Sequence, residues 1–543
     1  MEIKPLLKKD WVNYIQSFFV NKLYAQYIAL FLAGAFNLFS YAPFSAWPIV
    51  IITLSILIFA VSKAQTAKVA FRLGFFYGLG WFATGISWIH VAIADFGGMP
   101  TAISILLMAL LDGYLALFPA LACYLTKRFY ISNIGFAFIP FWLICEAIRG
   151  WFLTGFPWLS IGYTQTDGPL AGYAPVIGEF GIQALLLIIA VLIKTLLCHL
   201  FYRITKSQPN PDTPKTLSVT AITILLIIAV GNGLKSLNWF EQTDKSTSIA
   251  LVQGNIEQSI KWQPENEMPT MQTYLAMSQP HFESSDIVIW PEAAVPRLEV
   301  ISNDFLREID LIAADSNTAL ITGIVDYQPE TNKAFNNIIA LGKKYSNDSF
   351  GHYKYLHNNR FSKHHLLPIG EFVPFESFLR KLGPLFDLPM SSFSRGAYAQ
   401  DNLIANDVHI SPAICFEVAF SNQVRANIYQ GEHASDLILT VSNDAWFGNS
   451  HGPWQHLQIA QMRAIEFAKP VIRVTNNGVT AVIDGSGMLV KTLPQFEAAV
   501  LTHDLKLTTS NTPYYQYGNL PVWCVIVIFI AILIFKRKTL QLK

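Results

Sequence analysis

The sequence predicts two structures in one chain: a polytopic α-helical membrane domain of about eight spans, and an α/β domain. Hydrophobic residues make up 52% of the 543 residues and charged residues only 14%, which is too apolar for an ordinary soluble protein. Long apolar runs fill the first 235 residues, and shorter β-rich runs then alternate with helical patterns. That alternation indicates an α/β domain. The net charge of +1 gives no argument for a nucleic-acid partner.

Eight apolar stretches are long enough to cross a bilayer as helices. They lie near 24–42, 46–63, 70–92, 102–125, 134–152, 180–202, 217–235 and 520–535. We therefore expect a membrane domain at 1–236, an α/β domain at 237–516, and a last span with a short tail at 517–543. The opening segment lacks a small-residue cleavage site and runs directly into further spans, so we do not expect a cleaved signal peptide.

Lys and Arg residues are placed unevenly between the spans. They precede the first span, separate the second from the third, and follow the fourth, sixth and eighth, as at Lys8, Lys68, Lys127, Arg203 and Lys536. The loops at 93–101 and 153–179 contain no Lys or Arg. The positive-inside rule then predicts that both termini are cytoplasmic and that the α/β domain lies on the outer face.

Within 237–516, seven short runs rich in β-branched and aliphatic residues predict strands. These are Ile249–Val252, Ile287–Trp290, Ala319–Val325, Phe335–Leu341, Val408–Cys415, Leu437–Val441 and Val471–Val474. Helical patterns stand out at 303–315 and 454–468.

Cys415 is the one cysteine of the five that lies outside the long apolar runs. It ends a predicted strand, a place where reactive side chains are often presented. An isolated buried cysteine can also be a simple core residue. The carboxylates and the lysine found elsewhere in the domain favour a reactive thiol.

Two further stretches carry groups that a thiol nucleophile needs. Glu292 follows a strand that Pro291 ends, and in a partly apolar pocket its pKa would rise, which suits a general base. Lys363 and Glu371 flank a short apolar segment, and Glu417 lies two residues after Cys415. A thiol, a carboxylate base and a lysine suit acyl transfer through a thioester.

The neighbouring His364 and His365 suggest a metal site at first sight. Adjacent side chains point apart on most backbones, and no second cysteine or suitably spaced partner completes a ligand set. We therefore predict no metal site.

Taken in order, Glu292, Lys363 and Cys415 resemble the Glu–Lys–Cys triad of the nitrilase (carbon–nitrogen hydrolase) superfamily. The resemblance extends to three further stretches, 252–255, 442–448 and 475–478. Gln253–Asn255 followed by Lys261-Trp262, together with Lys363–Pro374, resembles the membrane branch of that superfamily, the apolipoprotein N-acyltransferases. Phe416 departs from the branch, which often has tyrosine there; the backbone N–H at that position is unaffected.

The resemblance implies a nitrilase-like αββα sandwich between seven spans and a last one, in the bacterial inner membrane with its catalytic domain periplasmic. It implies transfer of an acyl chain from a membrane phospholipid to the α-amine of a diacylglyceryl-cysteine on an apolipoprotein. No cofactor is implied, and we favour a monomer.

The same resemblance implies roles for individual residues. Glu292 would be the base, Cys415 the nucleophile, and Lys363 with the Phe416 N–H the oxyanion donors. Glu371 and Glu417 would support them. Two aromatic residues, Trp262 and Phe447, would contact substrate.

Two other functions are compatible with parts of the sequence. A membrane-anchored nitrilase-type amidase would use the same triad with water as acceptor. A transporter or receptor would carry an inert outer domain, but the spans hold few ionisable residues, Lys194 being the main exception.

Two segments leave alternatives open. Residues 375–395 are rich in large apolar side chains but interrupted by Gly383, Pro384 and Pro389. They form either a loop packed on the domain core or a mobile arm that covers the site and enters the outer leaflet. Near the end of the fifth span, Glu146 and Arg149 are spaced to pair with each other, for a structural or a functional purpose.

Overall fold

The computed structural model describes residues 23–130, 134–205, 214–368, 370–372, 393–430 and 433–541. The chain forms two compact units. A helical unit comprises 1–90, 100–237 and 519–543, and a sandwich unit comprises 91–99 and 238–518. Segment Val91–Met99 was expected to end the third span and begin a loop; instead it belongs to the sandwich unit.

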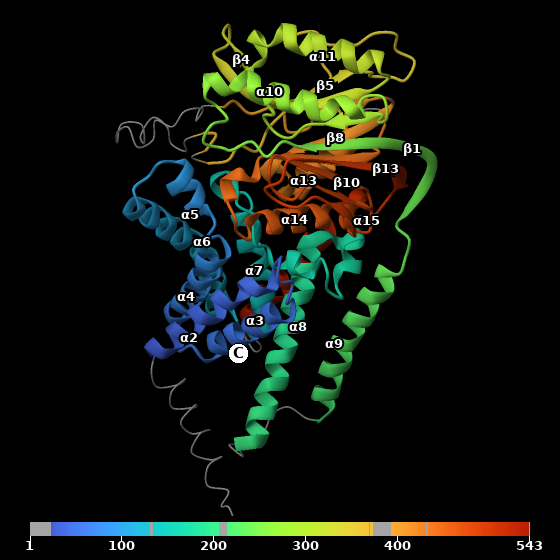
Figure 1. The fold of residues 1–543 in the computed structure, drawn as a ribbon. Helices are drawn as coiled ribbons and strands as arrows, with labels where there is room; N and C mark the ends of the chain where they lie inside the picture. The colour runs from blue at the N-terminus through green and yellow to red at the C-terminus, as the bar shows by residue number, and fades with distance from the viewer. Residues whose placement is uncertain are drawn as a thin grey trace, which may run out of the picture. The chain divides into compact units, whose positions relative to one another are not determined.

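A helix lies at each of the eight positions that the hydropathy pattern predicts (Figure 1). They are α2 (Leu23–Phe36), α3 (Pro48–Lys63), α4 (Ala67–Gly85), α6 (Thr101–Phe129), α7 (Ile134–Arg149), α8 (Ala174–Thr205), α9 (Pro214–Lys235) and α16 (Leu520–Gln541). Among the described residues, five helical segments are long and apolar enough to span a membrane. A sixth is added if α4 and Ile89–Phe96, bent by 63°, are counted together. The 16-residue helices α3 and α7 fall short of the predicted span length.

The pair Glu146 and Arg149 has a structural role in the helical unit. Both side chains are buried, and Arg149 binds the carboxylate through two contacts, Nε–Oε1 at 3.1 Å and Nη2–Oε2 at 2.6 Å. Its remaining nitrogen Nη1 donates to the carbonyls of Phe156 and Trp158. Pairing is needed because an unpaired charge would be costly at such a buried position. Since the paired Arg149 also donates to two loop carbonyls, it fixes the aromatic loop after α7.

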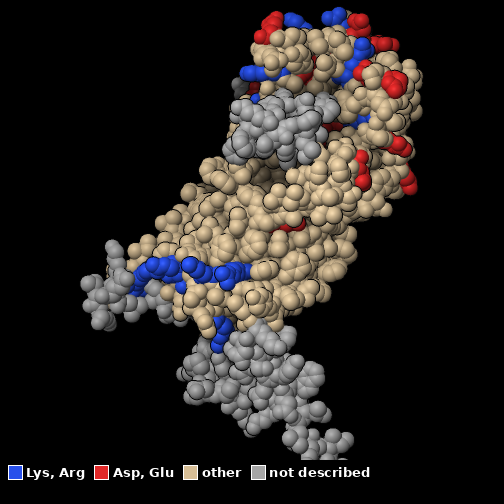
Figure 2. All heavy atoms as spheres, turned by 90° about the vertical axis from the view of Figure 1, so that its left-hand side faces the viewer, with Lys and Arg blue, Asp and Glu red and all other residues tan. Residues whose placement is uncertain are grey.

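Basic side chains gather in a band over the helical unit (Figure 2). Lys127 Nζ donates to Ser62 O at 3.4 Å, and Arg537 lies over the Phe129 ring at 5.2 Å. These contacts place the C-terminal ends of α3, α6 and α16 together. All three helices carry Lys or Arg near their C-terminal ends, as expected for ends that share one side of a membrane.

The sandwich unit is built from two β-sheets. The first has strand order β13-β1-β2-β4-β5-β6, with β3 beside β4. Its strands are β1 (Phe240–Gln253), β2 (Ile287–Ile289), β3 (Val295–Leu298), β4 (Ala319–Gln328), β5 (Lys333–Gly342), β6 (Arg360–Ser362) and β13 (Ala499–Ser510). The second has order β12-β11-β10-β9-β8-β7. Its strands are β7 (Leu403–Ala405), β8 (Val408–Ile414), β9 (Leu437–Ser442), β10 (Val471–Thr475), β11 (Ala481–Ile483) and β12 (Leu489–Thr492).

Alternation along the strands creates two apolar layers on the first sheet. Ile249 and Leu251 face the second sheet, whereas Ala250 and Val252 face helices α10 (Pro264–Ser278) and α11 (Asn303–Asp315). Helices α13 (Ser421–Ile428) and α14 (Gly452–Phe467) lie on the other side of the second sheet (Figure 1). The order helix–sheet–sheet–helix confirms the predicted αββα sandwich.

All seven predicted strands and both predicted helices are present. The helix predicted at 303–315 matches α11, and the one at 454–468 matches α14 to within two residues. Helix α10 was missed because Pro264 and Pro269 interrupt its pattern, although the first lies where a helix tolerates proline. The 12-residue β13 was missed because its exposed positions are polar or charged.

Candidate active site

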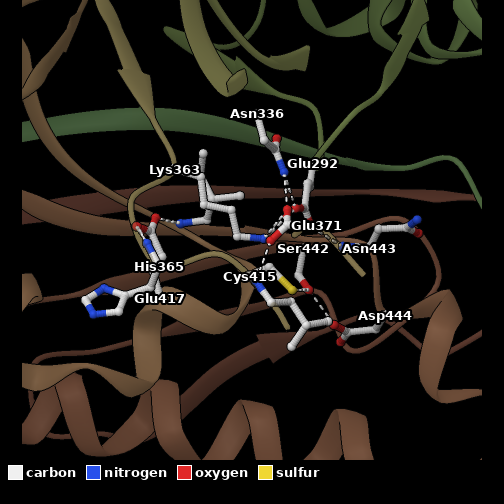
Figure 3. Close-up of polar contacts among 12 residues, drawn as sticks. Glu292, Asn336, Lys363, His365, Glu371, Cys415, Glu417, Ser442, Asn443 and Asp444 are labelled. Atoms are coloured by element: carbon white, nitrogen blue, oxygen red, sulfur yellow. Dashed lines mark hydrogen bonds and ion pairs between the residues drawn. The ribbon is translucent and has the colours of Figure 1, made fainter. Parts of the chain in front are cut away.

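Glu292 lies just beyond β2, where the backbone turns. Ala293 has a left-handed φ of 48°, and a Cβ at Gly323 on β4 would collide with the Ala293 nitrogen and the Glu292 Cα. Glycine at 323 therefore allows β4 to approach this turn closely. The turn directs the Glu292 carboxylate into a group of buried polar side chains (Figure 3).

Both oxygens of Glu292 accept hydrogen bonds. Oε1 accepts from Asn336 Nδ2 at 2.9 Å and Lys363 Nζ at 3.2 Å, and Oε2 accepts from the backbone N–H of Asn443 at 3.0 Å. Lys363 Nζ and Asn336 Nδ2 also reach Glu371 Oε1, at 2.9 and 3.0 Å. Lys363 and Asn336 thus bridge two carboxylates.

The charges of this group act strongly on one another. Burial raises the pKa of Glu292, but Lys363, the hydrogen bonds and Lys261 outweigh burial and hold it below its usual value. For Lys363, burial by itself would lower the pKa. The carboxylates of Glu292 and Glu371 outweigh burial and raise the pKa of Lys363 well above its usual range. The expectation of a raised pKa for Glu292 is therefore wrong: its cationic neighbour decides the direction.

Cys415 follows β8 and begins a short 3₁₀ turn, Cys415–Ala419. Its φ of 54° lies in the left-handed region, which costs a non-glycine residue about 1–2 kcal/mol. Its side chain points toward the group formed by Glu292, Lys363 and Glu371 (Figure 3), and Sγ accepts from Ser442 Oγ at 3.4 Å. Burial and the nearby Glu292 raise the pKa of Cys415, so the resting residue is a thiol that needs a base.

Glu417 joins the Cys415 turn to the segment that follows Lys363. Its Oε1 accepts from the backbone N–H groups of His364 at 2.8 Å and His365 at 3.1 Å, and from Gln423 Nε2 at 3.0 Å. Its Oε2 accepts from the N–H of Ile414 at 2.9 Å. Four donors on one buried carboxylate make Glu417 the connection between these two parts of the site.

The two histidines have structural partners instead of a metal-ligand arrangement. His364 Nδ1 lies 2.8 Å from Gly396 O, and His365 stacks on Phe420 with ring centroids 3.7 Å apart. In the described parts of the chain, no three His, Cys, Asp or Glu side chains cluster as metal ligands would.

The predicted aromatic substrate contacts lie in different environments. Trp262 is 36% exposed, whereas Phe447 is only 8% exposed and meets the His456 ring edge-on at 6.1 Å. Its neighbour Trp446 is the exposed one and packs edge-on against Phe96 at 5.6 Å. Phe416, 5% exposed, lies edge-on to Phe420 at 5.1 Å.

Several residues of the site were not predicted as site residues. Lys261 is buried and donates to the carbonyl of Glu292 at 3.2 Å, and burial lowers its pKa to about 8. Asn336, Ser442 and Asn443 contact the triad directly. Lys261, Ser442 and Asn443 lie in stretches that the sequence had marked, but Asn336 carried no signal. Residues 373–392, most of the proposed arm, lie outside the described residues.

Two family models match this chain. The carbon–nitrogen hydrolase family model matches residues 248–513, which defines the class of the sandwich unit. A model of the apolipoprotein N-acyltransferase N-terminal domain matches residues 33–192.

Full-length relatives give the particular family. Apolipoprotein N-acyltransferase of Vibrio parahaemolyticus is 42% identical over 501 residues, covering 91% of this chain and 94% of the relative. The apolipoprotein N-acyltransferase of Photobacterium profundum is 44% identical over 499 residues, covering 90% of this chain and 91% of the relative. The chain belongs to the apolipoprotein N-acyltransferase family.

Proposed function

We propose that this chain moves an acyl chain from a membrane phospholipid to the α-amine of a diacylglyceryl-cysteine on an apolipoprotein, through a thioester on Cys415. The observation that carries the proposal is the meeting of Glu292, Lys363 and Cys415 beyond the ends of β2, β6 and β8. Glu292 and Lys363 are 71 positions apart in the chain yet bond directly.

In the first half-reaction Glu292 accepts the proton of the Cys415 thiol, and the thiolate attacks the ester carbonyl of the phospholipid. Lys363 and the Phe416 N–H donate to the oxyanion that forms. When the tetrahedral intermediate collapses, the C–O bond breaks and the lysophospholipid leaves as an alcohol, taking the proton from Glu292. The acyl group is then a thioester.

In the second half-reaction the amine of the acceptor attacks the thioester carbonyl. Glu292 accepts a proton from the amine, the C–S bond breaks, and the Cys415 sulfur regains a proton. Ester, thioester and amide are at the same oxidation level, so the triad can complete the transfer with proton exchange alone. Glu371 orients Lys363, and Glu417 fixes the segments that carry Lys363 and Cys415.

We place the enzyme in the bacterial inner membrane, with both termini cytoplasmic and the sandwich unit, 238–518, on the periplasmic side, acting as a monomer. Both substrates carry acyl chains that stay in lipid while their reacting groups lie at the interface. The apolar helices of the helical unit match that requirement, and the basic ends of α3, α6 and α16 support the orientation.

Intact-mass analysis tests the proposal. Incubation with phospholipid should add one acyl group to the wild-type chain and none to Cys415→Ala. Addition of a diacylglyceryl-cysteine peptide should then remove the adduct and yield N-acylated peptide. Release of the acyl group as free fatty acid, at a rate that the peptide does not change, would instead support the membrane-anchored amidase.

A further inference from the structure

Three ionisable side chains lie buried beside Cys415 but outside the Glu292–Lys363–Cys415 group. Asp444 begins the 3₁₀ turn Asp444–Phe447, His456 lies on α14, and Arg473 lies on β10. All three are at most 2% exposed. Burying ionisable groups in this way is costly unless they are paired.

The three side chains are paired with one another and with Cys415. Arg473 Nη2 lies 2.5 Å from Asp444 Oδ2 and 3.1 Å from His456 Nδ1, which is itself 3.2 Å from Asp444 Oδ1. On the other side of the ring, His456 Nε2 lies 3.0 Å from the carbonyl oxygen of Cys415. The Arg–Asp pair thus supports a ring that touches the nucleophile's backbone.

The partner of Nε2 decides where the ring hydrogen lies. A carbonyl oxygen can only accept, so Nε2 must carry hydrogen and donate to Cys415. Burial and the adjacent Arg473 lower the pKa of His456, which keeps the ring neutral. In the neutral ring Nδ1 is an acceptor, and the Arg473 N–H is the donor that faces it.

The Cys415 carbonyl belongs to the same peptide group as the Phe416 N–H, one of the two proposed oxyanion donors. A trans peptide is planar, and its C=O and N–H point in opposite directions. When the Cys415 carbonyl is held toward His456, the Phe416 N–H must therefore point away from His456. A hydrogen bond accepted by the carbonyl also polarises the peptide and strengthens its N–H as a donor.

We infer that His456 is a positioning residue for the oxyanion site: its Nε2–H holds the Cys415 carbonyl so that the Phe416 N–H is aimed at the reacting carbonyl of the acyl donor. This inference rests on the proposed function, because it assigns a support to one of that reaction's donors. Arg473, which is itself held by Asp444, donates to Nδ1 and so favours the orientation and the tautomer that this contact requires.

Glutamine and asparagine at position 456 form a matched pair for the test. A glutamine amide can place an N–H near the position of Nε2, within reach of Cys415 O. The shorter asparagine places its amide near Nδ1, beside Asp444 and Arg473, and leaves the carbonyl without a donor. His456→Phe keeps the ring and removes both nitrogens.

Two rates separate positioning from general disruption. Acylation by phospholipid, followed by intact mass in single turnover, needs the oxyanion site. Alkylation of Cys415 by iodoacetamide needs the thiolate but forms no oxyanion. We expect His456→Asn and His456→Phe to slow acylation about 10–100-fold, somewhat less than deletion of a whole donor, with alkylation within about threefold of wild type. His456→Gln should restore acylation to within about threefold.

The inference is overturned if acylation and alkylation fall together in folded protein, or if the asparagine variant acylates as fast as the glutamine variant. If His456→Phe does not fold, the Gln and Asn pair still decides. If wild-type protein forms no acyl adduct while iodoacetamide still alkylates Cys415, the proposed function fails instead, which is a different result.

Discussion

Replacing Glu417 with glutamine tests whether one buried carboxylate holds the Lys363 segment against the Cys415 turn. The substitution keeps the shape of the side chain and removes its charge. In the native site all four groups that face the carboxylate are N–H donors, three at Oε1 and one at Oε2. Only a group with two acceptor oxygens can satisfy them all.

The magnitude follows from this geometry. A glutamine amide has one oxygen and one NH₂, so in either orientation its NH₂ faces the Ile414 N–H or the donors at Oε1. At least one buried backbone N–H is then unsatisfied, at a cost of about 1–3 kcal/mol. About 2 kcal/mol corresponds to a fall in Tm of roughly 4–8 °C. If the same free energy is lost from the transition state, acylation slows roughly 30-fold.

The assay is single-turnover acylation by phospholipid, read by intact mass, beside a thermal melt of the same detergent-solubilised protein. Glu466→Gln is the matched control. Glu466 is also fully buried and pairs with Arg463, but it lies ten positions beyond His456 on α14, about 15 Å along the helix. We expect the control to lower Tm while acylation stays near the wild-type rate. A folded Glu417→Gln protein that acylates within threefold of wild type would refute the reasoning.

The remaining predictions concern the nucleophile, the charges and the topology. Cys415→Ser should leave a folded protein that forms almost no acyl adduct, because a hydroxyl ionises far less readily than a thiol; near-normal turnover would exclude Cys415 as nucleophile. Lys363→Ala should slow acylation about 100-fold or more through loss of an oxyanion donor. An unchanged rate of adduct formation would show that Lys363 is not an oxyanion donor. Lys261→Met removes a cation that, after Lys363, helps to hold down the pKa of Glu292. That pKa should rise, so the base form is lost at a higher pH and the acid limb of the acylation rate moves upward; an unmoved limb would contradict this electrostatic account. A reporter that is active only outside the cytoplasm should work when fused near Asn347 and fail when fused after Lys543, and the reverse pattern would overturn the orientation.

Local patterns in the sequence were sufficient for the division into a helical and an α/β domain and for two of the strand ends that carry the chemistry, whereas the αββα arrangement was implied by the family resemblance. The apolar runs gave the positions of the helices because a membrane helix must be apolar over most of its length, although α3 and α7 are shorter than predicted. Short continuous apolar runs gave the seven strands because each side of a strand in a sandwich faces its own apolar layer. Glu292 and Cys415 were found because both follow directly on such strands.

The same reasoning failed where the outcome depended on a distant partner. The pKa of Glu292 was expected to rise with burial, but Lys363 lies against it and reverses the direction. Phe447 was expected to meet substrate, and that contact stays a prediction: the turn after Asn443 packs Phe447 against His456 and leaves its neighbour Trp446 more exposed.

The sequence by itself therefore determined most of the elements and the side chains that follow two of the strands, since both depend on neighbours in the chain. Tertiary structure alone decided which polar groups meet. Asn336 is an unmarked residue near the start of β5, yet the pairing of β5 with β6 brings its carbonyl to the Lys363 N–H at 2.8 Å and its amide to both Glu292 and Glu371. A shift of one residue would turn that amide to the opposite face of the sheet. Strand register is fixed by packing across the whole domain, so no local pattern could assign Asn336 to the site.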